Sequence, residues 1–189
     1  MRILKITAVL FFVLLLNSPV QADHHEHGAH QHGAATLGIA FEGVQGKVEF
    51  KGAAEGILGF EHTPKSAKDK KTLSDATAQF ESSIAKMVAM DPKLGCEFST
   101  DRVGLFKEAP MEEHHAGHDK PKKDHKVHGE HSDFVANFNV KCAKSPLGTK
   151  LTVDFSSFKG IRDLDITVLI GTIQKSAEFN KKPVVIELQ

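Results

Sequence analysis

The chain has 189 residues with 24 basic and 24 acidic side chains, so its formal charge is zero when histidine is neutral. Its hydrophobic content of 40% suffices for one packed domain of ordinary size but not for several. The balanced charge argues against a nucleic-acid-binding protein, and the lack of Trp and Tyr argues against an aromatic carbohydrate or choline site. Histidine is unusually frequent: 11 of the 12 fall in two short windows.

Residues 1–22 have the pattern of a secretory signal peptide. Arg2 and Lys5 precede an uninterrupted apolar run over residues 6–16, and Val-Gln-Ala at 20–22 fits a cleavage site. The run has about half the length needed to cross a bilayer core of roughly 30 Å, so we do not predict a membrane anchor. We expect export to the periplasm, cleavage after Ala22, and no membrane association afterwards.

The first histidine-rich segment opens the expected mature chain. Residues 23–33 are polar and without apolar periodicity, so we predict a disordered tail there, followed by a single domain over residues 34–189. The tail histidines are His24, His25, His27, His30 and His32.

A β-hairpin is predicted at the start of the domain. Residues 36–42 and 47–51 alternate apolar and polar side chains around an expected four-residue turn, 43–46. Residues 52–60 are apolar and glycine-rich, and we interpret them as a connection that crosses the sheet edge.

The next segment predicts the main amphipathic helix. Apolar residues recur there every three or four positions: Leu73, Ala76, Phe80, Ile84 and Met87. Thr63-Pro64 is the expected start, with Ser66 and Asp69 as an alternative capping pair. Asp91-Pro92 and Gly95 are expected to end the helix.

Cys96 and Cys142 are the only cysteines. In an exported protein the simplest prediction is one disulfide, and a thiolate metal site and a catalytic thiol are the alternatives. Residues 96–106 and 132–142 both have strand patterns. In the antiparallel register that places the two cysteines opposite each other, Phe106 lies opposite Ser132, and residues 107–131 form the loop between the strands.

Three further strands are predicted at residues 150–155, 163–170 and 183–188. Strands therefore outnumber helices and neighbour one another in sequence. This pattern predicts an α+β fold: a single domain made of an antiparallel β-sheet with one main amphipathic helix, a histidine-rich N-terminal tail and a histidine-rich hairpin loop.

The hairpin loop carries the second histidine-rich segment. Its histidines are His114, His115, His118, His125, His128 and His131, and Asp and Glu residues are interleaved with them. Imidazole is a common ligand of Zn(II), Cu(II) and Ni(II), and the short spacings allow one segment to place several nitrogens around a tetrahedral ion. Because ordering a loop costs entropy, we expect exchangeable binding suited to capture and hand-off rather than to catalysis. Solubilising low-complexity sequence is the alternative interpretation.

The neighbouring residue types favour Zn(II). Interleaved carboxylates suit this borderline ion, and the absence of clustered Cys and Met argues against a Cu(I) site. Cleavage after Ala22 would give a mature start of Asp23-His24-His25. A histidine third from a free amine can enclose Cu(II) or Ni(II) in a square plane, which is a second metal hypothesis for the N-terminus.

Two candidate ligands lie outside these clusters. His62, in the sequence Phe-Glu-His-Thr-Pro, is either a ligand or a hydrogen-bonded structural residue beside a helix start. His131 and Asp133 flank the start of a predicted strand and are expected on the same side of it, so a shared ligand role is predicted. Ser132 between them lies in nothing that resembles a nucleophile elbow, so we predict no nucleophile there.

Together these segments resemble the ZrgA family of zinc-regulated, histidine-rich periplasmic proteins, from His30 to Leu188. The resemblance rests on the following stretches: His32-Gly33-Ala34-Ala35-Thr36-Leu37, Gly59-Phe60-Glu61-His62-Thr63-Pro64, Gly95-Cys96, His131-Ser132-Asp133-Phe134 leading to Cys142, and Phe155 through Gly160-Ile161 to Ile166. It implies zinc binding and a part in zinc acquisition beside an ABC-type importer, and it supplies no ligand assignments.

The leading prediction is a non-enzymatic periplasmic Zn(II)-binding protein that captures or buffers zinc and supports its uptake by an ABC-type importer. The alternatives are an adaptor or structural protein with a metal- or pH-sensitive histidine patch, a Cu(II)- or Ni(II)-binding protein, and a metallo-hydrolase that uses the loop as its site.

Overall fold

The computed structural model describes residues 33–107 and 132–189. Within these ranges the chain forms nine strands, two α-helices and one 3₁₀ turn, η1 (Pro92–Leu94). The helices are α1 (Ala54–Leu58) and α2 (Ala67–Met87). The strands are β1 (Ala34–Glu42), β2 (Gln45–Ala53), β3 (Val88–Met90), β4 (Glu97–Phe106), β5 (Asp133–Lys141), β6 (Lys150–Val153), β7 (Asp163–Ile170), β8 (Ile173–Phe179) and β9 (Val184–Glu187). None of the helices in the described ranges is long and apolar enough to cross a membrane.

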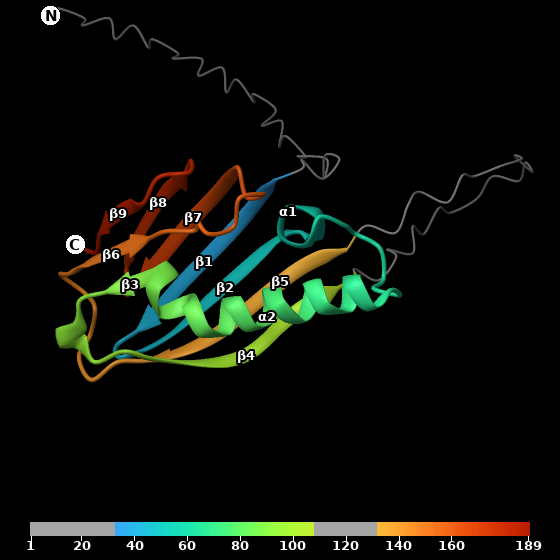
Figure 1. The fold of residues 1–189 in the computed structure, drawn as a ribbon. Coiled ribbons are helices and arrows are strands. Elements are labelled where there is room, and N and C mark those ends of the chain that lie inside the picture. Colours follow the sequence, from blue (N-terminus) through green and yellow to red (C-terminus); the bar gives the residue numbers. More distant parts are fainter. Residues whose placement is uncertain (1–32, 108–131) are drawn as a thin grey trace, which may run out of the picture.

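Two sheets build the domain (Figure 1). The larger has six strands in the order β4-β5-β2-β1-β7-β8, and the smaller has three in the order β3-β6-β9. Every strand pairing in the described ranges is antiparallel except that between β1 and β7, which is parallel. The single α+β domain with one main helix is confirmed, but the prediction of a wholly antiparallel sheet is wrong. The parallel pair joins strands far apart in sequence, and strand patterns do not reveal such a pairing.

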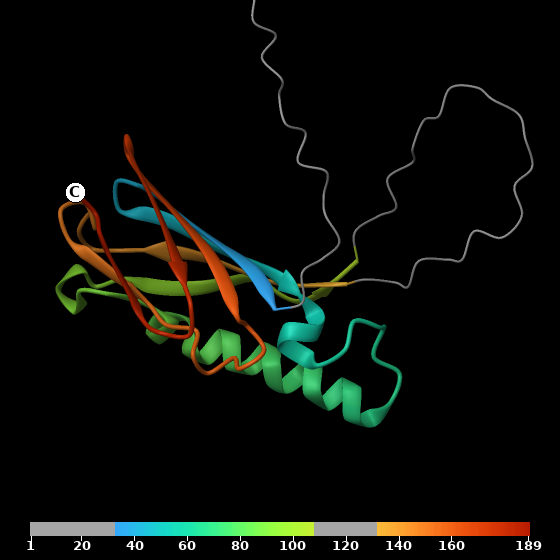
Figure 2. The same cartoon turned by 90° about the horizontal axis from the view of Figure 1, so that it is seen from above.

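One face of the six-stranded sheet packs against α2, while the opposite face, here called the outer face, has no layer over it in the described part of the chain (Figure 2). Phe80, in the middle of α2, is fully buried. Its ring lies 5.0 Å from that of Phe50 and 5.1 Å from that of Phe134, and 4.4 Å from that of Phe158. This aromatic cluster joins the helix to the centre of the sheet, because aromatic side chains contribute large buried apolar areas.

The start of α2 follows from a capping box. Ser66 is the N-cap: its hydroxyl accepts the Asp69 N–H at 3.0 Å, and Asp69 Oδ2 accepts the Ser66 N–H at 3.3 Å. The expected start at Thr63-Pro64 is therefore wrong, and the alternative capping pair is confirmed, because the reciprocal bonds satisfy two amides that the helix leaves without partners. The helix also ends earlier than expected, at Met87.

Both predicted hairpins form, but the turn of the first and the register of the second differ from the prediction. Between β1 and β2 the turn has two residues, with Gly43 at a positive φ of 61°, because Gly46 joins the ladder opposite Phe41. Between β4 and β5 the expected register holds from Glu97 to Thr100 and then shifts by one residue. Asp101 is the extra residue of this β-bulge, so Phe106 lies opposite Asp133 and not opposite Ser132.

Three elements were not predicted. Helix α1 follows β2 directly and ends at Gly59, which has a positive φ of 77° and donates its N–H to the Glu55 carbonyl. Strand β3 has only three residues, and β8 forms a hairpin with β7 around Gly171. Much of the core consists of alternate residues of the predicted strands, which are buried as expected, and Phe158 and Ile161 between β6 and β7 add to it.

Candidate metal centre

Both histidine-rich segments join the described domain at the same end of the six-stranded sheet (Figure 1). The pairings place one row of residues across this end: Leu105, Phe134, Gly52 and Ala35. Asp133 and Ala34 each lie one residue outside this row, on β5 and β1. Neighbouring strands are about 4.8 Å apart, so Asp133 and Ala34, two strands apart, are separated by about 10 Å. Ala34 begins the domain after the tail, and Asp133 begins β5 after the loop. The connections to the two segments are therefore close neighbours, although about 100 residues separate them in sequence.

The connection to the tail is held by three glycines. The Gly33 carbonyl accepts the Arg162 N–H at 2.8 Å, and its φ of 86° is one that L side chains rarely adopt. A Cβ at Gly33 would lie 2.9 Å from the Gly160 carbonyl oxygen, and a Cβ at Gly160 would overlap the Gly56 carbonyl. Because these three glycines have no side chains, the 158–162 segment fits between α1 and the start of β1. This contact fixes the position from which the tail leaves the domain.

The loop returns to the sheet at Asp133, the only ionisable residue that is buried in the described ranges. Its Oδ2 lies 3.0 Å from Nζ of Lys51, and its side chain is 8% exposed against 50% for Lys51. A buried carboxylate requires a compensating charge, and Lys51 on β2 supplies it.

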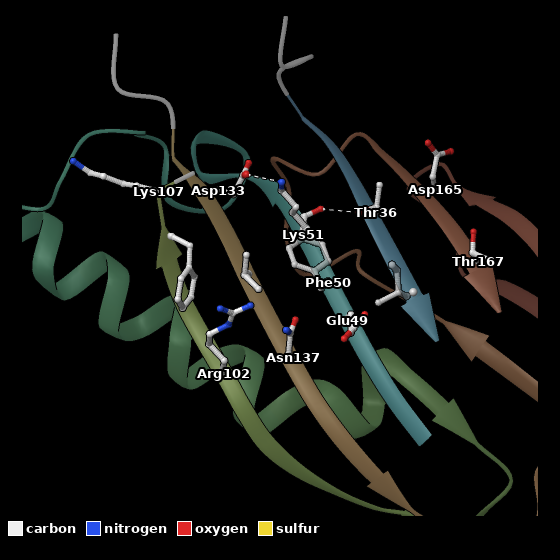
Figure 3. Close-up of a pocket in the computed structure, with 14 residues that line it drawn as sticks. Thr36, Glu49, Phe50, Lys51, Arg102, Lys107, Asp133, Asn137, Asp165 and Thr167 are labelled. Atoms are coloured by element: carbon white, nitrogen blue, oxygen red, sulfur yellow. Dashed lines mark hydrogen bonds and ion pairs between the residues drawn. The ribbon is translucent and has the colours of Figure 1, made fainter. Parts of the chain in front are cut away.

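Asp133 and Lys51 line one end of a groove on the outer face (Figure 3). The groove has a volume of about 590 Å³ and crosses β4, β5, β2, β1 and β7. Arg102 lies over the ring of Phe106, 4.4 Å from its centroid, and Asn137 stands beside it. The groove is lined both by cationic side chains and by the carboxylates of Glu49 and Asp165. It therefore offers polar partners, but its electrostatic potential is not dominated by one sign of charge.

Ser132, next to Asp133, has its side chain on the opposite side of the chain. Its carbonyl accepts the Ala54 N–H at 3.0 Å and so joins the start of β5 to the start of α1. Its hydroxyl is buried and has no hydrogen-bond partner among the described residues. A nucleophile needs an adjacent base to be activated, and in the described ranges no base is hydrogen-bonded to this hydroxyl.

The connection between α1 and α2 lies at this same end of the molecule in both views (Figures 1 and 2). His62 is part of this connection. Its ring is 4.8 Å from that of Phe60, and its Nε2 is 3.4 Å from Oδ2 of Asp69, the residue in the capping box. The Ser66 hydrogen bond, and after it that of His62, hold the pKa of Asp69 below its ordinary value. The contacts of His62 match the alternative of a hydrogen-bonded residue at a helix start.

The predicted disulfide is confirmed. Cys96 and Cys142 are joined, with an S–S distance of 2.04 Å and a sequence separation of 46. The bridge closes the β4–β5 hairpin at the end opposite Asp133. Nine residues of strand at about 3.3 Å each place it about 30 Å from the connections to the histidine-rich segments.

Four of the predicted site residues lie in the described part: Asp133, His62 and the two disulfide cysteines. The others lie outside it: His24, His25, His27, His30, His32, His114, His115, His118, His125, His128 and His131. The residues inside do not converge, since no group of three or more His, Cys, Asp or Glu in the described ranges is placed to hold a metal. No sequence pattern singles out Lys51, because on its strand it is one of several alternating polar residues.

Comparison with known families gives one match. A family model described as ZrgA family zinc uptake protein matches residues 29–188. No curated protein matches the chain. The matched range includes both sheets, α2, the disulfide and the second histidine-rich segment, so it covers most of the chain.

Proposed function

Since the chain belongs to the ZrgA family of zinc uptake proteins, we propose that it is a periplasmic Zn(II)-binding protein that captures or buffers zinc and supports its uptake by an ABC-type importer. The observation that carries the proposal is the position of Ala34 and Asp133 at one end of the sheet, each one residue outside the row that pairs Ala35, Gly52 and Phe134. It brings the connections to both histidine-rich segments to one end of a rigid domain.

The ligands in this proposal are the imidazoles of the two segments, with Asp133 at the foot of the loop. Neutral imidazole nitrogens and carboxylate oxygens both suit Zn(II). A connection separation of about 10 Å is short compared with the reach of a ten-residue segment, which is up to about 33 Å when extended. Nitrogens from the tail and from the loop are therefore able to meet on one ion.

The proposed role is binding and transfer, not catalysis. The protein contributes a rigid domain with a disulfide about 30 Å from the connections to the histidine-rich segments, and zinc is the cargo. Ligands carried on long segments favour exchange over a fixed open coordination position, which catalytic zinc sites require. The importer component that would receive the ion is part of the proposal, as is the periplasmic location, which rests on the signal-peptide pattern of residues 1–22.

The test is isothermal titration of the mature protein with Zn(II) at neutral pH. In the key variant a four-residue glycine-containing turn replaces residues 108–131. Because Phe106 and Asp133 are opposite each other, a short turn closes this hairpin without moving the strands. We expect micromolar or tighter binding by the parent protein and loss of most bound zinc in the variant.

A variant with the five tail histidines changed to glutamine separates the contributions of the two segments. A fall in affinity in this variant, with the loop intact, indicates ions shared between tail and loop. Full zinc binding after both changes would contradict the proposal, as would an absence of zinc binding by the parent protein.

A further inference from the structure

The charge balance around Asp133 has a consequence for zinc exchange, and this inference rests on the function proposed above. Asp133 is 6% exposed as a residue, and Ser132 is the only other polar residue buried in the described ranges. An ionised carboxylate in such a position is stable only when a cation or several hydrogen-bond donors compensate it. Removal of the cation leaves an anion that binds another cation more strongly.

The geometry of the pair favours reversible contact. In the β2–β5 ladder Asp133 lies opposite Ala53, and Lys51 lies opposite Val135. Lys51 therefore reaches Asp133 along the diagonal, over the small side chain of Ala53, a distance that long side chains span. Half of the Lys51 side chain is exposed, and it borders the outer-face groove, which has about 590 Å³ of space beside it (Figure 3). The ammonium group has room to move away without disturbing the core.

Lys51 and zinc compete for Oδ2 of this carboxylate. The ammonium nitrogen is 3.0 Å from that oxygen, next to the position that a zinc ion bound to it at about 2.0–2.2 Å would take. A divalent cation and an ammonium on the same oxygen also repel each other in a buried, weakly screened position.

We propose that Lys51 is a resident counter-cation of Asp133 that zinc displaces. When zinc binds, the Asp133–Lys51 ion pair breaks, an oxygen–zinc bond forms, and the ammonium moves into the groove with its proton. When zinc leaves, Lys51 returns and prevents an uncompensated buried charge. Lys51 thereby weakens zinc binding and favours release, which suits a protein that passes its ion to a partner.

The experiment compares zinc affinity and zinc-induced thermal stabilisation in four single variants and one double variant. Lys51→Met removes the competitor, and we expect zinc to bind at least three-fold more tightly and to raise the melting temperature more than in the parent. Lys51→Arg keeps a cation with bidentate geometry, so we expect weaker zinc binding. This second variant retains the buried charge pair, and the test therefore does not depend on the folding of Lys51→Met.

Lys47→Met is the matched control, because Lys47 is also an exposed lysine of β2 and the substitution removes the same charge. It should leave zinc affinity unchanged. Asp133→Asn should weaken binding, and the double variant Lys51→Met/Asp133→Asn should match Asp133→Asn alone. Equal affinities in the parent, Lys51→Met and Lys51→Arg would overturn the inference, as would equal tightening by Lys47→Met or tightening by Lys51→Met when Asp133 is absent. These results would leave the proposed function intact, whereas a parent protein without zinc affinity would remove its basis.

Discussion

Phe106, the last residue of β4, lies directly opposite Asp133, the first residue of β5. Residues directly opposite in an antiparallel pair have their Cα atoms about 4.5–5.5 Å apart. The ends of the histidine-rich loop are therefore as close as the ends of an ordinary tight hairpin, and the strands do not need the loop's length.

Replacement of residues 108–131 by a four-residue turn should consequently leave the domain folded and make it slightly more stable. A shorter loop costs less entropy to close. The shortening should therefore raise the free energy of unfolding by about 1 kcal/mol. Urea unfolding followed by far-ultraviolet circular dichroism measures the change. Unfolding or a marked loss of stability in this variant would mean that the loop contributes to the core, and its zinc titration would then be uninformative.

The disulfide should stabilise the domain without influencing zinc. It closes a separation of 46 residues, and the loop-entropy estimate for this length is about 4 kcal/mol. In a variant with Cys96→Ser and Cys142→Ala, we expect a loss of that order in the free energy of unfolding and an unchanged zinc stoichiometry, since the bridge lies at the far end of the sheet. A changed number of bound ions at a temperature where the variant is folded would show that the two ends are coupled.

The capping box of α2 predicts a pH dependence of stability. The hydrogen bond of Ser66, and then that of His62, lower the pKa of Asp69 in the folded protein from its ordinary 3.8. A group with a lowered folded pKa stabilises fully above its unfolded value, and this contribution is lost as the pH falls through the folded value. The difference in the free energy of unfolding between the parent and Asp69→Asn should therefore be fully present well above pH 3.8 and shrink as the pH falls below 3.8.

Ser66→Ala tests the same cap at neutral pH. Loss of an N-cap hydroxyl costs about 1 kcal/mol, and the variant should also bring the pKa of Asp69 back toward its ordinary value. Chemical-shift titration of the Asp69 carboxyl follows the second effect directly. A pKa that stays low in Ser66→Ala would show that His62, and not the cap, is responsible.

The sequence predicted most strands because their inward positions are strongly apolar. Strand β7 alternates from Leu164 to Ile170 and was located at its observed bounds. Strand β8 was missed because Lys175 and Ala177 occupy inward positions, opposite Val168 and Ile166, and weaken its pattern. Two capping signals competed for the start of α2. The reciprocal Ser66–Asp69 hydrogen bonds of the folded chain decide between them.

The candidate site was harder to predict than the fold. Asp133 was singled out for its place beside His131, but its partner Lys51 depends on the pairing of β2 with β5, two strands that do not follow each other in the chain. The register beside it also depends on the bulge at Asp101, which alternation alone does not indicate. The common end of the tail and the loop arises from the same pairings, and the order of strands in the sheet is not readable from local patterns.

The glycine contact beneath the tail gives the last prediction. A methyl group at residue 160 would overlap the Gly56 carbonyl, so Gly160→Ala forces the 158–162 segment or α1 to move. Overpacking of this kind costs about 1–3 kcal/mol. The movement should weaken the hydrogen bonds of the Arg162 and Asp163 amides to the Gly33 carbonyl and speed their hydrogen exchange. Gly38→Ala is the control, because the nearest neighbour of the added Cβ would be the Glu49 carbonyl oxygen at 3.9 Å.

If tail and loop share zinc, Gly160→Ala should weaken zinc binding while Gly38→Ala leaves it unchanged. Fast exchange at Arg162 with parent-like zinc affinity would show that zinc capture does not need a fixed origin for the tail.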